Sequence, residues 1–389
     1  MERNKSDVVS KINKIRDKEQ RKALNAWAAQ HFCGSIIAGT GFGKSRVGVL
    51  AVEHAIKDGG DALILVPTVQ LQDQFRQEFA KWGVSCENVT VLCYQSAYKL
   101  KDLFYDIVVC DEIHLGLSPE YRKFFENNSF DKLLCMTATL PEDMEYRFLL
   151  DQMAPIAYKI TLDKCVKLGI VSPYEITCVP VELTEEERKE YKKINSRYVY
   201  WKLQLGNFDA FNEARRIMAN RSATGVQKQA AAQFYRCIRA RKQIVDFADN
   251  KINMFQEIYA ANTDRKILVF GGANEFTDRL CNSIPGGMAY HSNKTKKQKE
   301  LAIKSFKNDS INILFSTKAL NQGFDVPNAN MGIICGITSK SLSMIQRVGR
   351  LIRFQEDKIG KIYIVYVADS QEEKWLKNAT KSLKNIIWK

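Results

Sequence analysis

The sequence of 389 residues lacks the features of several common protein classes. Its ten cysteines are scattered singly and include no C-x-x-C pair, so we expect reduced thiols rather than a disulfide framework or a zinc site. No stretch is apolar for long enough to span a membrane, and the first residues lack the apolar core of a secretory signal. We also find no low-complexity tract and no short-period repeat. These absences favour a cytoplasmic protein without a membrane partner.

The composition is that of a globular protein with an excess of positive charge. Hydrophobic residues make up 45% and charged residues 26% of the chain, and its length predicts two or three domains. The formal net charge is +14. Such an excess favours a polyanionic partner, with nucleic acid ahead of a membrane surface.

The segment Ala38–Ser45, A-G-T-G-F-G-K-S, lies between a short apolar run and a stretch with helical periodicity. A strand, a glycine loop, Lys-Ser and a helix in this order predict a phosphate-binding P-loop. Glycines let backbone N–H groups point inward, and the helix N-terminus adds positive potential. Lys44 would reach the β- and γ-phosphates of ATP, and Ser45 would bind Mg²⁺. The candidate ATP-binding residues of this loop are Gly39, Thr40, Gly41, Gly43, Lys44 and Ser45. The alternative is a chance glycine-rich turn, which the flanking segments disfavour.

Two further polar segments follow apolar runs. Ile107–Cys110 leads into Asp111-Glu112-Ile113-His114, where Asp111 would hold Mg²⁺ and Glu112 would orient and deprotonate the attacking water. The alternative is a polar turn after a buried strand. Leu133–Met136 leads into Thr137-Ala138-Thr139, whose hydroxyl groups suit a hydrogen-bond relay.

Short β-type runs alternate with helical stretches from residue 31 to about 140, and a second such pattern begins at Lys266. This alternation predicts an α/β fold with two parallel sheets in tandem. We expect an N-terminal helical segment at 1–30, a first domain at 31–175, a linker and basic helical insertion at 176–260, and a second domain at 261–389. The insertion either binds nucleic acid by charge and stacking or packs with a solvated basic face, and the sequence leaves both open.

Gln346-Arg347-Val348-Gly349-Arg350-Leu351-Ile352-Arg353 is the most specific signal of the second half. Arg350 and Arg353 lie one helical turn apart and can face the same way. A guanidinium group stabilises charge that develops on a transferred phosphoryl group. The alternative, a basic amphipathic helix, does not explain the combination of Gln, Gly and both Arg.

Gln20, A-G-T-G-F-G-K-S, D-E-I-H and T-A-T, in this order, resemble the motifs of superfamily 2 helicases of the DExH type. The compact layout is most similar to phage-encoded UvsW-like and XPB-like DNA helicases. The resemblance covers the chain from Gln20 to about Val367. It implies two RecA-like domains with ATP and Mg²⁺ between them, and it makes Arg353 our first choice and Arg350 our second choice for an arginine finger.

The resemblance also implies roles for other residues. Gln20 would read the adenine edge, Gly323 would permit a tight turn, and Asp325 would contact the ribose. The chain departs from the family at Gln322, where the family often has an acidic residue. The residues implied in coupling are His114, Thr137, Thr139 and Gln346. The residues implied in nucleic-acid contacts are Pro67, Thr68, Tyr94, Gln95, Ser96, Phe270, His291, Ser292, Ser316 and Thr317.

We therefore predict an ATP-dependent DNA helicase or translocase that unwinds or remodels branched or single-stranded DNA, acting as a monomer. By analogy with the family we expect 3′→5′ movement and, for a phage-encoded protein, the host cytoplasm. The alternatives are an RNA helicase of the same superfamily and a nucleotide-gated nucleic-acid binder that does not unwind. Intact Glu112 and the arginines at 350 and 353 argue against the last alternative.

Overall fold

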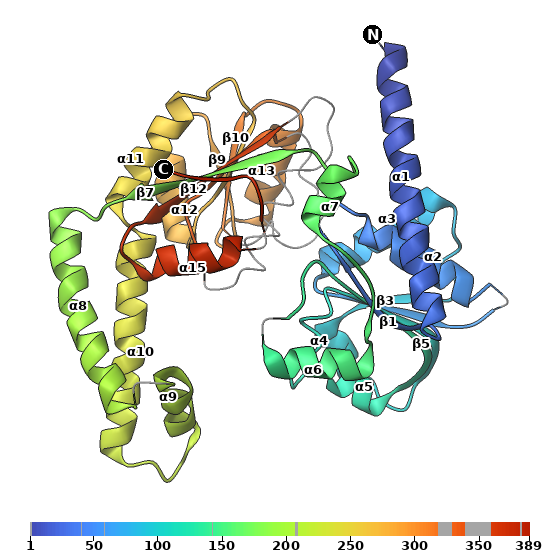
Figure 1. Ribbon diagram of the computed structural model, residues 1–389, viewed down its shortest axis with the longest axis horizontal. Helices are drawn as coiled ribbons and strands as arrows, with labels where there is room; N and C mark the ends of the chain where they lie inside the picture. The colour runs from blue at the N-terminus through green and yellow to red at the C-terminus, as the bar shows by residue number, and fades with distance from the viewer. Residues whose placement is uncertain are drawn as a thin grey trace.

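The computed structural model describes residues 2–39, 41–57, 59–141, 143–206, 209–317, 329–338, 359–381 and 383–389. These residues form two sheets of parallel strands, each packed with helices, and a helical arm that projects away from the second sheet (Figure 1). The predicted α/β fold with two sheets in tandem is confirmed. Among the described helices, none is both long and apolar enough to cross a bilayer.

The first sheet has the strand order β3-β2-β4-β5-β1-β6. Its strand β2 and the segment 107–110 of β4 are continuous apolar runs, as expected for strands buried on both faces. Helices α1, α2 and α3 cover one face, and α4, α5 and α6 cover the other. The strands are β1 (Cys33–Ala38), β2 (Ala62–Val66), β3 (Val89–Cys93), β4 (Phe104–Asp111), β5 (Ser129–Thr137) and β6 (Ile156–Ile160). The helices are α1 (Glu2–Ala29), α2 (Lys44–Ala55), α3 (Val69–Trp82), α4 (Tyr94–Ala97), α5 (Lys123–Asn127), α6 (Met144–Met153) and α7 (Leu162–Lys167).

The second sheet has the strand order β13-β7-β12-β11-β8-β10-β9. Helices α11 and α12 cover one face, and α13 and α15 cover the other. The strands are β7 (Tyr174–Val181), β8 (Ile267–Phe270), β9 (Met288–Tyr290), β10 (Ile313–Ser316), β11 (Met331–Ile334), β12 (Gly360–Val367) and β13 (Ile386–Trp388). The helices are α11 (Asp249–Ala260), α12 (Asn274–Asn282), α13 (Lys296–Lys307) and α15 (Gln371–Thr380).

The second α/β unit begins earlier in the chain than the predicted range 261–389. Strand β7 pairs with β12 along its whole length and with β13 on its other side, so it lies inside the second sheet. Phe255 and Ile258 of α11 are buried in the same core. The range 176–260 therefore contains a strand and a helix of the second unit. In the sequence the arm separates β7 from the rest of the βα pattern, whereas α11 directly precedes β8.

The arm consists of α8 (Glu185–Gln204), α9 (Ala210–Ala219) and α10 (Gly225–Asp246) (Figure 1). Its helices pack on a small core of their own that includes Leu205, Ile217 and Phe234. Capping boxes begin α8 at Thr184 and α10 at Thr224. The arm therefore has local start signals and a set of apolar contacts of its own.

The connection between the two sheets is packed rather than exposed. Ile170, Val171 and Ser172 are all buried. Arg16 of α1 donates a hydrogen bond from Nη2 to the Ile170 carbonyl oxygen at 2.9 Å. A Cβ atom placed on Gly41 would lie 2.4 Å from Cγ1 of Val171, so the connection touches the glycine loop of the first unit.

Candidate nucleotide site and nucleic-acid interface

The glycine loop joins β1 to α2 at the carboxyl edge of the first sheet. Gly41 and Gly43 have φ angles of 87° and 89°, a left-handed conformation that glycine adopts without strain. Helix α2 begins at Lys44, and no side chain caps its N-terminus. Its first N–H groups therefore remain available to an anion, as phosphate binding requires. Thr40 lies outside the described residues.

Lys44 lies at the mouth of this loop. Its Nζ donates a hydrogen bond to the Ala38 carbonyl oxygen at 3.2 Å, so the ammonium group folds back over the loop. Its charge also acts on Asp111 and Glu112 at the end of the neighbouring strand β4. The structure thus brings together the P-loop lysine and the two carboxylates that the sequence predicts.

Asp111 ends β4 and is buried. Its Oδ1 has no hydrogen-bond partner among the described residues. Burial, reinforced by the charge of Glu112, raises the pKa of Asp111 to about 7. A buried carboxylate oxygen without a protein partner fits a site that a metal ion or its water completes, and carboxylate and hydroxyl oxygens are ligands that Mg²⁺ prefers. Asp111 and Ser45 are thus suitable to hold such an ion.

Glu112 adopts a left-handed backbone with a φ of 49°, which is uncommon for a residue with a side chain. Its Oε2 accepts a hydrogen bond from Thr137 Oγ1 at 3.2 Å and lies 3.4 Å from His114 Nδ1. Burial alone would raise the pKa of Glu112, but Lys44, His114 and Thr137 lower it to about 2. Glu112 is therefore ionised at neutral pH and can accept a hydrogen bond from a water molecule.

Thr137 at the end of β5 connects the carboxylate to the next loop. Its buried hydroxyl lies 3.2 Å from Glu112 Oε2, 3.0 Å from the Thr139 carbonyl oxygen and 3.4 Å from His114 Nδ1. The hydroxyl of Thr139 is buried without a partner among the described residues. Of the four predicted coupling residues, His114 and Thr137 thus lie beside Glu112, and Thr139 contacts Thr137. Gln346 lies outside the described residues.

The Gln20 amide is held against the glycine loop. Its Nε2 donates to the carbonyl oxygens of Phe42 at 2.8 Å and Gly43 at 3.3 Å, and its Oε1 accepts from Arg46 Nη1 at 2.6 Å. Only 1% of Gln20 is exposed. In this structure its amide braces the phosphate-binding loop, and a role in reading adenine remains a prediction.

Sequence reasoning missed the surroundings of Arg46. This residue forms an ion pair with Asp17 at 2.5 Å, and its guanidinium carbon lies 4.2 Å from the centre of the Trp82 ring. Arg46 directly follows Lys44-Ser45, and this position next to the P-loop was the only indication in the sequence that it belongs to the site. Its partners are separated from it by 29 and 36 residues, so the sequence pattern did not connect them.

The predicted nucleic-acid contacts in the first unit differ in their accessibility. Thr68 forms the N-terminal cap of α3, and its Oγ1 is buried without a partner among the described residues. Gln95 and Ser96 are exposed. Tyr94 is buried and donates a hydrogen bond to the Asp111 carbonyl oxygen at 2.9 Å. Its side chain therefore supports the backbone of Asp111 and is not exposed for a contact with nucleic acid, contrary to our expectation.

The predicted contacts in the second unit are mostly buried. Phe270 lies in the core, and His291 is buried with Nε2 2.9 Å from Asp278 Oδ1. The Thr317 hydroxyl is 2.9 Å from that of Thr277. Ser292 is exposed and accepts a hydrogen bond from Asn274 at 2.8 Å. Gly323, Asp325, Gln346, Arg350 and Arg353 lie outside the described residues.

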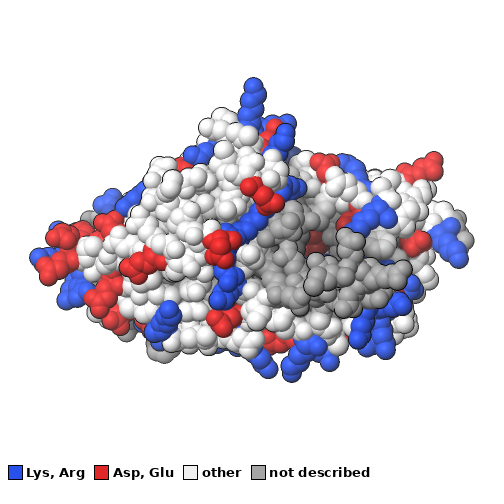
Figure 2. All heavy atoms as spheres, turned by 90° about the horizontal axis from the view of Figure 1, so that it is seen from above, with Lys and Arg blue, Asp and Glu red and all other residues white. Residues whose placement is uncertain are grey.

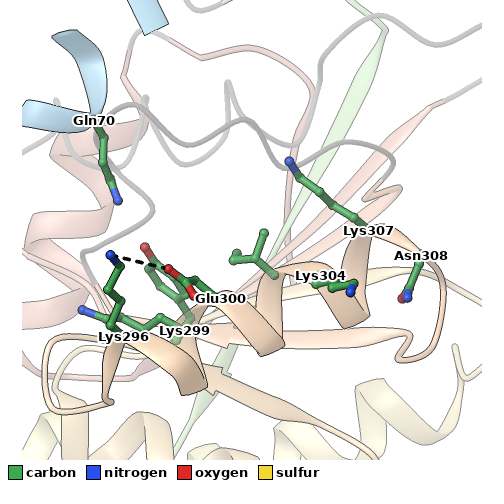
Figure 3. A pocket seen from close by; sticks show the side chains of 9 residues that line it. Gln70, Lys296, Lys299, Glu300, Lys304, Lys307 and Asn308 are labelled. Carbon is green, nitrogen blue, oxygen red and sulfur yellow. Dashed lines mark ion pairs between the residues drawn. The ribbon is translucent and has the colours of Figure 1, made fainter. Parts of the chain in front are cut away.

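A groove of about 660 Å³ separates the N-terminal end of α3 from α13. Figure 3 shows Gln70 on one side and the side chains of α13 on the other. The helix contributes four lysines and one glutamate, Glu300, which lies 4.0 Å from Lys296. The lysines are Lys296, Lys299, Lys304 and Lys307. A groove with this charge suits a polyanion that touches both units.

Two family profiles match the chain. Residues 13–142 match the family described as type III restriction enzyme, res subunit, and residues 250–355 match the helicase conserved C-terminal domain. The chain is a superfamily 2 helicase. It is accordingly a nucleic-acid-dependent ATPase that uses a metal ion for hydrolysis.

Individual relatives match a larger part of the chain than the two family profiles do. The DNA 3'-5' translocase XPB2 of Sulfurisphaera tokodaii is 25% identical over 89% of this chain and 80% of its own length. A 51.5 kDa protein of a Lactococcus phage is 22% identical over 82% of this chain and 62% of its own. Pre-mRNA-splicing RNA helicases also match, over about half of their own length or less. The Pyrococcus furiosus Hef helicase domain has a similar fold, with a TM-score of 0.57, 15% identity and coverage of 93% of this chain and 99% of its own.

Proposed function

We propose that this helicase couples ATP hydrolysis to movement on DNA and that it unwinds or remodels branched DNA as a monomer. The observation that carries the choice of DNA is the match to an archaeal DNA translocase over 89% of the chain. The RNA helicases that match share less of their own length with this chain. An RNA substrate is the alternative.

In the proposed mechanism the first unit binds and activates the nucleotide. The glycine loop and Lys44 would bind the phosphates, while Ser45 and Asp111 would hold Mg²⁺. The ion, when bound, neutralises charge on the phosphate oxygens. Glu112 orients a water molecule, since its carboxylate is ionised and held by Thr137. It takes the proton of this water as the water attacks. Arg353, with Arg350 as second choice, stabilises the charge of the transition state from the second unit.

The proposed nucleic-acid track crosses both units. The exposed N-terminus of α3 in the first unit and the lysines of α13 in the second face the same groove. These groups recognise phosphates, so binding should depend on salt and little on sequence. ATP would favour closure of the two units, and hydrolysis would release it. On the face seen in Figure 2, basic side chains are interspersed with acidic ones rather than gathered in one field.

The arm supports the proposal of a branched substrate. Residues 191–242 contain twelve Lys or Arg and two Asp or Glu, so this segment accounts for +10 of the net charge of +14. Arg236 and Arg239 are exposed on α10. A cavity of about 370 Å³ extends from Arg239 and Lys242 to Asn274 and Asn293 on the second unit. The arm therefore offers a basic surface next to a cavity that reaches the second unit, and a further DNA segment can bind there.

The first experiment measures ATP hydrolysis at fixed salt with no polymer, single-stranded DNA, single-stranded RNA and a four-way DNA junction. Strong stimulation by DNA, greatest for the junction, is the expected result. Stimulation by RNA alone would overturn the assignment to DNA. Equal stimulation by the junction and by single strands would overturn the branched substrate.

A second experiment tests the arm. The double variant Arg236→Ala/Arg239→Ala should weaken junction binding and reduce the slope of log affinity against log salt by about one for each lost phosphate contact. Its matched control, Arg76→Ala/Lys81→Ala on α3, removes the same charge from another exposed surface. Equal salt slopes for the two variants would remove the arm from the binding surface.

A further inference from the structure

A lysine and a glutamate of the second unit form an ion pair that is completely buried. Lys251 of α11 and Glu372 of α15 are both 0% exposed, and Lys251 Nζ lies 2.7 Å from Glu372 Oε1. The roles assigned above to the nucleotide site use neither residue. Burial of a charged pair requires a specific reason, because the cost of removing two charges from water is large.

The pair binds the backbone that follows strand β11. Lys251 Nζ also donates to the Cys335 carbonyl oxygen at 3.0 Å, and the Ile337 N–H donates to Glu372 Oε1 at 3.3 Å. The other carboxylate oxygen, Oε2, accepts from the Val367 N–H at the end of β12, at 3.0 Å. Each charged group thus holds a backbone group of the segment 335–337.

The same segment is confined on its other side by the loop after β8. The N–H groups of Cys335 and Gly336 donate to the Phe270 carbonyl oxygen at 2.9 and 3.2 Å. A Cβ atom on Gly336 would lie 2.1 Å from the Gly272 nitrogen, so no side chain fits between the two backbones. The exit of β11 is therefore fixed between two layers of polar contacts.

Stability alone does not account for this arrangement. A buried ion pair is often no more stabilising than a well-packed apolar pair of similar volume, whereas its hydrogen bonds fix geometry. The surrounding core is apolar, with Phe255, Met331 and Ile333 as typical members. The pair lies at the carboxyl ends of β11 and β12, and ligands of open α/β sheets bind at this edge.

From Thr338 the chain continues into residues 339–358, which contain Gln346, Arg350 and Arg353. We infer that Lys251 and Glu372 are positioning residues that fix the point from which the arginine-bearing segment leaves the sheet. Their role is to set the placement of these arginines for ATP turnover, without contact to the nucleotide. The inference rests on the function proposed above for the arginines.

The test compares three variants of the full chain, each measured well below its melting temperature. Lys251→Met removes the bond to Cys335 and leaves Glu372 unpaired. Lys251→Met/Glu372→Gln removes both charges. The new amide at position 372 can donate a hydrogen bond to the Cys335 carbonyl oxygen or accept one from the Ile337 N–H. The control, Lys266→Met, breaks the ion pair of Lys266 with Asp309 near the amino end of β8.

We expect Lys251→Met to lower kcat by about ten- to a hundredfold, the scale on which a misplaced reacting group acts, while KM for ATP changes little. The double variant should recover part of the lost kcat, and Lys266→Met should keep the parent kcat. A parent-like kcat for folded Lys251→Met would overturn the inference, as would an equal loss in the control.

Failure of the proposed function has a different signature. If Arg350 and Arg353 have no role in turnover, their alanine variants keep the parent kcat whatever the Lys251 variants do. A loss in the Lys251 variants beside active arginine variants would therefore refute the inferred purpose of the pair and leave DNA-stimulated hydrolysis intact.

Discussion

Replacement of Glu112 by glutamine should separate ATP binding from ATP hydrolysis. The amide has the size of the carboxylate, and its oxygen can still accept the hydrogen bond from Thr137 that Glu112 accepts at 3.2 Å. It cannot accept a proton from water. The variant therefore preserves the shape of the site while it removes the base.

The expected loss follows from that chemistry. A positioned general base contributes about 10²- to 10⁴-fold to the rate, which corresponds to about 3–5 kcal/mol of activation free energy. The lowered pKa of Glu112 means that the carboxylate is ionised at neutral pH, so the whole enzyme population loses its base in the variant. Binding of ATP should change by only a few fold, because Lys44 and the glycine loop remain.

The assay measures steady-state hydrolysis with saturating DNA and, separately, the affinity for a fluorescent ATP analogue. Asp102→Asn is a suitable control, since Asp102 also has a left-handed backbone, with a φ of 56°, and precedes the same strand at its other end. This control should keep the parent kcat. A kcat for Glu112→Gln within a few fold of the parent would refute the assignment of the base.

Gln20→Ala should raise KM for ATP by about tenfold through loss of the amide that braces the glycine loop, and an unchanged KM would show that the loop holds its shape without it. Arg353→Ala should lower kcat by about 10³-fold with a nearly constant affinity for nucleotide, and single-turnover hydrolysis at the parent rate would contradict this. Partial burial alone would raise the pKa of Asp278, but Lys294 and His291 lower it, so its stabilising effect is present above about pH 4 and is lost as pH falls through the lowered pKa. Asp278→Asn should therefore reduce the melting temperature at neutral pH and have progressively less effect below about pH 4, whereas a penalty independent of pH would indicate lost packing.

Patterns that depend on neighbours in the chain were predictable. The apolar runs of β2 and β4 were recognisable in the sequence as interior strands of a parallel sheet. In the structure these runs are buried on both faces. Asp111 and Glu112 follow such a strand directly, so their place at the carboxyl edge came from the same pattern. The order of residues along the chain was enough to predict these features, because a single strand positions each of them.

Buried charge was not predictable from the same patterns. Lys251 stands between Asn250 and Ile252, and Glu372 lies in the run Gln-Glu-Glu-Lys, so both resemble solvated helix residues. Their burial depends on the meeting of α11 and α15, which are separated by more than a hundred residues. Tyr94 is a related case, since its motif suggested nucleic acid and its partner proved to be the Asp111 backbone.

The buried connection at Ile170–Ser172 has a mechanical consequence. Val171 packs against Gly41, so the segment that joins the two units also forms a wall of the phosphate-binding loop. A pull on the second unit, such as tension in a bound DNA strand, would load this wall directly. The affinity for nucleotide should then vary with applied force, because the segment that connects the two units contacts the nucleotide site.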